Sequence, residues 1–153
     1  SSNETEEGVV ILYGSMYGNT EQLADILAQS LAASGVKSIV CHNVTKSAPS
    51  VILRDVFRYR GLIIGSPTYC GELFSPIENL MNLIRIRDVK DRIYAAFGSY
   101  AWAPAALKRL RPFAEEMKWE AVGEGFELKM ADLPSVIGAA WDLGTQMAER
   151  LKA

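Results

Sequence analysis

The chain has few cysteines, one histidine and no long apolar run, and each shortage excludes a class of protein. Cys41 and Cys70 form no CxxC pair, and together with His42 they are too few to close a Cys/His zinc site. Free thiols predict a cytoplasmic setting. No apolar run approaches the roughly 20 residues that a membrane-spanning helix requires, so we expect no membrane segment.

An excess of charge of either sign is also absent. The 16 Lys and Arg residues nearly balance the 18 Asp and Glu residues, and a net charge of −2 does not favour nucleic acid as a partner. A length of 153 residues is enough for one domain with a core. Because residues 1–7 are polar and acidic, we interpret them as a disordered tail or linker remnant, and expect the folded domain to span 8–153.

Apolar, strand-like runs alternate with helical patterns along the rest of the chain. Val9–Tyr13 is apolar on both faces, which is typical of a strand buried between two helix layers. The alternation predicts an α/β fold, a three-layer sandwich with a five-stranded parallel sheet and helices on both faces. We expect strands near 9–13, 38–41, 61–65, 93–97 and 119–129, the last broken by Gly123 and Gly125. We expect helices at 21–34, 48–59, 104–117 and 134–151, and one more that begins with the hydroxyl of Ser75 as its N-cap.

The most informative segment, Ser15–Thr20, lies between the first predicted strand and the first predicted helix. Its backbone N–H groups, its hydroxyls and the positive end of the following helix together predict an anion site. The segment has no Lys or Arg, and the chain has no Gly-Lys-Ser/Thr motif of a nucleotide triphosphatase. A phosphate group bound there need not belong to ATP or GTP.

Two further loops, 66–71 and 98–103, follow the third and fourth predicted strands. Ligands of parallel sheets bind outside the carboxyl ends of the strands, so we expect these two loops to lie beside the segment Ser15–Thr20. Their aromatic residues indicate that a flat ring stacks there, and the phosphate site then predicts FMN. The candidate cofactor-binding residues are Ser15, Met16, Tyr17, Gly18, Asn19, Thr20, Pro67, Thr68, Tyr69, Cys70, Gly71, Ser99, Tyr100, Ala101 and Trp102. No catalytic and no metal-ligating residue is predicted.

These loops resemble those of flavodoxins, and most closely the flavodoxin domain of flavodiiron proteins (A-type flavoproteins). The resemblance rests on Ser15-Met16-Tyr17-Gly18, Gly65-Ser66-Pro67-Thr68 and Phe97-Gly98-Ser99-Tyr100, whereas Ala101 and Ala103-Pro104 depart from the family's Gly and Ser-Gly. It covers the chain from about Gly8 to the end. It implies strand order 2-1-3-4-5, non-covalent FMN, and one- or two-electron transfer from a redox donor to an acceptor.

The resemblance also implies a partner. The acceptor is expected to be the diiron centre of a flavodiiron protein, an oxygen or nitric oxide reductase, carried by a metallo-β-lactamase-like domain. With His42 as its one histidine, this chain is not that domain. We therefore expect either a redox partner protein or a covalently linked diiron domain, and a homodimer is left open. The near-neutral charge favours a domain within a larger polypeptide over a free shuttle.

Other functions stay open from the sequence: a stand-alone flavodoxin shuttle, a small flavin-dependent NAD(P)H:quinone reductase, and an interaction module without flavin. Whether the chain is itself an enzyme is also open. A phospho-receiver domain is rejected because Tyr13-Gly14 and Gly65-Ser66 stand where it requires Asp. A low-molecular-weight phosphatase requires Cys-x5-Arg in the first loop, which contains no Cys.

Overall fold

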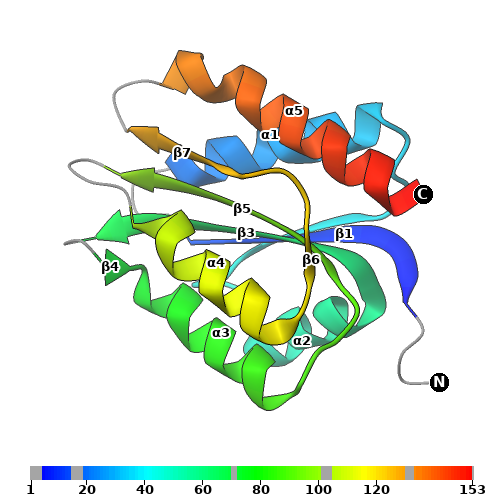
Figure 1. Ribbon diagram of the computed structural model, residues 1–153, viewed down its shortest axis with the longest axis vertical. Helices are drawn as coiled ribbons and strands as arrows, with labels where there is room; N and C mark the ends of the chain where they lie inside the picture. Colours follow the sequence, from blue (N-terminus) through cyan, green and yellow to red (C-terminus); the bar gives the residue numbers. More distant parts are fainter. Residues whose placement is uncertain (1–4, 15–18, 70–71, 101–104, 130–132, 153) are drawn as a thin grey trace.

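The computed structural model describes residues 5–14, 19–69, 72–100, 105–129 and 133–152. Helices and strands alternate along these residues as the apolar pattern predicts (Figure 1). In chain order they are β1 (Glu6–Tyr13), α1 (Asn19–Ala33), β2 (Ile39–Asn43), α2 (Pro49–Arg58), β3 (Tyr59–Tyr69), β4 (Glu72–Leu73), α3 (Ser75–Ile86), β5 (Ile93–Tyr100), α4 (Ala106–Met117), β6 (Glu120–Ala121), β7 (Phe126–Lys129) and α5 (Leu133–Lys152).

The sheet is parallel in the order β2-β1-β3-β5, and β5 pairs with both β6 and β7 on its other side. Since β6 and β7 are the two parts of the expected fifth strand, the predicted order 2-1-3-4-5 is confirmed. The break lies at residues 122–125, which contain the two expected glycines. The short strand β4, antiparallel to β3, was not predicted.

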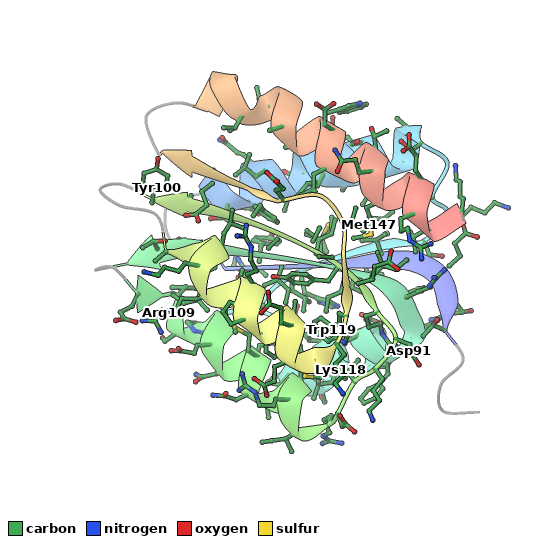
Figure 2. The ribbon with its side chains drawn as sticks, viewed as in Figure 1. Asp91, Tyr100, Arg109, Lys118, Trp119 and Met147 are labelled. Carbon is green, nitrogen blue, oxygen red and sulfur yellow. The ribbon has the colours of Figure 1, made fainter. Side chains whose placement is uncertain are left out.

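Helices cover both faces of the sheet and enclose two separate cores. Figure 1 shows α1 and α5 on one face and α2, α3 and α4 on the other. Successive strand residues point to opposite faces, so β1 and β3 supply apolar side chains to both cores. Figure 2 shows Met147 on the α5 side of the sheet and Trp119 on the α4 side, and both side chains are buried. The predicted three-layer fold is confirmed.

Two details of the expected elements differ from the structure. Strand β1 begins at Glu6, which pairs with Tyr59, two residues before the expected start of the domain. The expected hydroxyl cap of α3 was wrong, because Phe74 is the N-cap and Ser75 already lies inside the helix. Phe74 provides no side-chain cap for α3. Pro76, in the first turn, has no backbone N–H and so leaves no donor without a partner.

One predicted face was also partly wrong. The apolar period of residues 134–151 predicts that Ile137 and Trp141 of α5 point inward, but they are 43% and 41% exposed. The buried stripe of α5 instead contains Ala140, Leu143, Met147, Ala148 and Leu151, which pack against α1 and the sheet. The helical period alone fixes the width of an apolar stripe but not its angle toward the sheet.

Arg92, at the start of β5, is a buried cation that ties β5 to α2. Its side chain is 4% exposed in the protein, and Nε and Nη2 donate to the carbonyl oxygens of Val56 and Phe57 at 3.0 and 3.1 Å. Nη1 donates to the carbonyl of Lys90. The carbonyls of Val56 and Phe57 lie in the last turn of α2, where carbonyl groups lack partners within the helix, and that of Lys90 lies in the turn before β5. A cation is favoured at a helix C-terminus.

Replacing Arg92 by Met is therefore expected to lower the free energy of unfolding by about 2–4 kcal/mol, because several buried carbonyls lose their donor. Urea titration followed by circular dichroism measures the loss. Arg150→Met is the matched control, since Arg150 pairs with Glu120 at the surface and should change the midpoint little. Equal shifts in the two variants would contradict this account of Arg92.

Candidate functional site

The register of the parallel strands brings distant segments of the chain to one edge of the sheet. Tyr13 pairs with Gly65, Gly65 with Phe97, and Phe97 with Phe126, so these residues form one row across the sheet. The segments singled out in the sequence all follow this row. The predicted loop bounds were partly wrong, because β3 continues to Tyr69 and β5 to Tyr100, so residues 66–69 and 98–100 belong to strands. Figure 1 shows β3, β5 and β7 ending on the same side of the molecule. The loops therefore start side by side, as predicted.

Two glycines at this edge allow close approach of neighbouring elements. The fully buried Phe97 lies against Gly65, where an added Cβ would be 2.1 Å from the ring atom Cζ of Phe97. At Gly98 an added Cβ would be 2.6 Å from the Cβ of Ala106 in the first turn of α4. A side chain at either position would push β3 from β5, or α4 from the sheet. Both glycines hold the edge at its observed spacing.

On the α1 side of the sheet, a pair of buried hydroxyls joins the start of α1 to the end of β5. The Thr20 Oγ1 and Ser99 Oγ atoms are 3.2 Å apart, and the two residues are 1% and 3% exposed. They are separated by 79 positions in the sequence. Both belong to the predicted site residues, and the structure brings them into contact.

This hydroxyl pair fits a phosphate group. Two hydroxyls hold two hydrogens, and the bond between them uses one, so the second hydrogen can be donated to an anion. The first N–H groups of the 15-residue helix α1 have no partner within the helix and carry its positive dipole end. The donors are neutral and already placed, which suits a phosphate monoester held without Lys or Arg.

On the α4 side, two side chains from strand ends hold the start of α4. Thr68 Oγ1, near the end of β3, accepts the backbone N–H of Ala105 at 3.0 Å. Glu127 Oε1, on β7, accepts the backbone N–H of Leu107 at 3.0 Å. A carboxylate at a helix N-terminus is favourable. Glu127 was not predicted, because no local motif marks it and only the pairing of Gly98 with Glu127 brings it to the edge.

Tyr13, the last residue of β1, directly precedes the first loop. Its hydroxyl donates to Glu21 Oε1 of α1 at 3.4 Å. Burial raises the pKa of Tyr13 to about 12, and the negative charge of Glu21 adds to this rise. The phenol is therefore protonated throughout the ordinary pH range. This contact, which was not predicted, attaches the first turn of α1 to the end of its strand.

The structure describes only part of the predicted site. Ser99 and Tyr100 end β5, Pro67 to Tyr69 end β3, and Asn19 and Thr20 begin α1, all at the same edge of the sheet. Figure 2 shows Tyr100 at the tip of β5. The remaining predicted residues lie outside the described residues: Ser15, Met16, Tyr17, Gly18, Cys70, Gly71, Ala101 and Trp102.

The described part of the chain holds no group of three or more His, Cys, Asp or Glu side chains arranged to bind a metal ion. His42 uses both ring nitrogens elsewhere: Nε2 lies 2.6 Å from Asp55 Oδ2 and Nδ1 lies 2.8 Å from Ser47 Oγ. These contacts join β2 to α2. Among the same described residues, no helix combines the length and the apolar character needed to cross a membrane.

Comparison with known proteins agrees with this geometry. Residues 11–139 match the family model described as Flavodoxin. The anaerobic nitric oxide reductase flavorubredoxin of Vibrio vulnificus is 32% identical over 111 residues, which are 72% of this chain and 22% of that protein. The chain spans only 22–37% of the length of the first curated relatives that it matches.

Two solved structures of similar fold are longer than this chain, which matches about a third of each. The flavodiiron core of Flv1 from Synechocystis sp. superposes with a TM-score of 0.88 at 25% identity, over 95% of this chain and 36% of that one. Rubredoxin oxygen:oxidoreductase from Desulfovibrio gigas gives a TM-score of 0.93 at 23% identity, over 98% of this chain and 37% of that one. At this identity the second likeness shows the shared fold alone.

The contact between Tyr13 and Glu21 yields a test by pH. Glu21→Gln should lower the pKa of Tyr13 from about 12 toward the ordinary value of 10.0, measured by NMR on tyrosine labelled at Cζ. The folded state holds this proton more tightly than the unfolded chain. The contribution of the protonated Tyr13 to the stability of the folded state is therefore complete below pH 10 and is lost as the pH rises toward 12.

Asp25→Asn is the control for this titration, because Asp25 lies on the same helix and contributes the smallest of the effects that raise the pKa of Tyr13. A Tyr13 phenol that titrates near 10 in the unchanged protein, or that shifts equally in both variants, would show that the Glu21 contact is not formed.

Proposed function

The chain belongs to the flavodoxin family, whose cofactor is FMN, and we propose that it passes electrons from a redox donor to the diiron centre of a flavodiiron protein. In this proposal the chain is the flavodoxin domain of an oxygen or nitric oxide reductase and works in the cytoplasm. Bound FMN supplies one- or two-electron transfer. The chain binds and orients the FMN and determines the charge around its ring.

The observation that carries the proposal is the buried hydroxyl pair of Thr20 and Ser99. The pair lies at the N-terminus of α1 and at the carboxyl ends of the parallel strands. Phosphorylated ligands bind at this position in such folds. We assign the phosphate group to residues 15–20. We assign the ring to Pro67, Thr68, Tyr69, Cys70 and Gly71, and to Ser99, Tyr100, Ala101 and Trp102.

The charges near the proposed ring site favour a low reduction potential. The loops 66–71 and 98–103 contain no Lys or Arg. Arg109, on the outer side of α4, pairs with Glu72 through a contact of 2.6 Å between Nη2 and Oε2, which offsets its charge. The described residues of β3 and β5 beyond Gly65 and Phe97 include no Lys or Arg that would attract added negative charge. A ring that gains electrons there is stabilised less than in a cationic site.

The partner is proposed to be a linked domain. The first curated relatives are about 2.6 to 3.9 times as long as this chain, so most of each relative lies outside the matched region. The one histidine of the chain is bonded to Asp55 and Ser47. The irons of a diiron centre would then be held by another part of the polypeptide or by another protein.

The first experiment is the visible absorption spectrum of the purified chain, before and after FMN is added and the excess removed. Oxidised-flavin bands that survive gel filtration, with quenched fluorescence, are the expected result. A colourless protein that takes up no FMN would overturn the proposed function of this chain and leave only its fold.

Variants of the hydroxyl pair test the assigned phosphate site. Thr20→Val and Ser99→Ala should each weaken FMN binding by roughly tenfold or more, because hydrogen bonds to a charged group contribute about 1.5–3 kcal/mol. Since the two hydroxyls contact each other, the double variant should lose less than the product of the two single effects. Titration of the apoprotein, followed by flavin fluorescence, measures all three affinities.

Thr145→Val is the matched control for the phosphate site. It removes a hydroxyl that donates to the carbonyl of Trp141 in α5 and lies 3.4 Å from Ser30 Oγ, in the C-terminal half of α1 and away from residues 15–20. Its FMN affinity should equal that of the unchanged protein. If Thr20→Val binds FMN as well as Thr145→Val does, the phosphate does not lie at residues 15–20.

A further inference from the structure

A cavity lies away from the carboxyl ends of the strands, between α4 and the segment that joins β6 to β7. Its volume is about 190 Å³. Tyr94 pairs with Ala121, and Phe97 pairs with Phe126, so two residues of β5 face four residues of the neighbouring segment. The extra residues bulge out of the sheet, helped by Gly123 and Gly125 at φ values of 64° and 78°. The bulge leaves space beside β5.

Apolar side chains form most of the cavity wall. Leu107 and Ala114 come from α4, Trp119 and Val122 from the segment after it, and Tyr94 from β5. The Tyr94 and Trp119 rings lie with their centroids 5.9 Å apart. Three charged residues, Arg111, Glu115 and Glu124, also line the cavity, and all three are exposed. The inner surface is thus apolar and aromatic, with charges confined to its exposed part.

One polar atom of this wall has no partner. The Tyr94 side chain is 4% exposed in the protein, and its hydroxyl makes no hydrogen bond to any of the described residues. Buried hydroxyls are nearly always hydrogen-bonded, so an unpaired one calls for a missing partner. Burial raises the pKa of Tyr94 well above its usual range, which keeps the phenol protonated and able to donate.

We propose that this cavity binds a small, neutral aromatic molecule that offers one hydrogen-bond acceptor to the Tyr94 hydroxyl. The rings of Tyr94 and Trp119 favour an aromatic body. An uncharged ligand is favoured because the buried wall of the cavity carries no charged side chain, and the charged residues Arg111, Glu115 and Glu124 lie at its exposed part. An acceptor is required because the buried Tyr94 hydroxyl, which has no partner among the described residues, is a protonated donor.

This cavity is separate from the proposed FMN site. Tyr94 lies five positions before Ser99 on the same strand, which is about 16 Å along β5. Tyr94 is also not among the residues that we assign to FMN. The proposal therefore does not depend on the flavin function, and a failure of one leaves the other untouched.

Two probe molecules of the same shape test the proposal. Acetophenone carries a carbonyl acceptor on a planar ring, and ethylbenzene lacks the acceptor. We expect both to shift the amide NMR signals of residues 94–96 and 119–125 in the purified chain, with acetophenone binding about tenfold more tightly, as one net hydrogen bond predicts.

Tyr94→Phe completes the comparison, because it removes only the hydroxyl. In this variant the two probes should bind with equal affinity, and ethylbenzene should bind as it does to the unchanged protein. The flavin spectrum of Tyr94→Phe should also equal that of the unchanged protein. Absence of shifts with both probes at millimolar concentration would overturn the proposal. So would an acetophenone preference that survives in Tyr94→Phe, since the acceptor would then bind elsewhere.

Discussion

The rest of the structure depends on the row of strand pairs that joins Tyr13, Gly65 and Phe97. A parallel strand buried on both faces cannot slip by one residue without turning every apolar side chain to the wrong core. The register of β1, β3 and β5 is therefore strongly constrained. The carboxyl ends of these strands therefore lie at one edge of the sheet, although β3 and β5 continue past the row at which β1 ends. The candidate site results from this constraint on the sheet.

The two faces of the sheet contribute different chemistry at this edge. Ser99 points toward α1, where it meets Thr20 and forms a neutral donor pair suited to phosphate. Thr68 and Glu127 lie on the other face and hold the start of α4 through its backbone. The alternation of side chains along a strand separates these roles. Ligand donors and structural acceptors can therefore lie at the same strand ends without competing.

The same sheet carries its least regular strand at the opposite edge from β2. There the fifth strand leaves β5 after Ala121 and returns at Phe126. An outer strand tolerates such a bulge because its other side has no neighbouring strand among the described residues. The bulge exposes part of the α4 core and leaves the Tyr94 hydroxyl beside a cavity. An irregular edge can thus create a site that the regular centre of the sheet cannot.

The sequence by itself determined the order of helices and strands, because each has its own period of apolar residues. It also determined which loops leave the carboxyl ends of the strands, and its loop motifs led to the flavodoxin family, which the comparisons confirm. The break of the fifth strand was likewise visible, since Gly123 and Gly125 interrupt an otherwise strand-like run. These features depend on neighbours in the chain and can be seen locally.

Only the tertiary structure decided which side chains meet across long sequence separations. Thr20 was predicted to bind phosphate, but its contact with Ser99 depends on how α1 packs over β5. Glu127 has no motif and reaches α4 only through strand register. The exposure of Trp141 depends on the angle at which α5 lies on the sheet. Register and packing angle are set by the whole core at once, and no local pattern contains them.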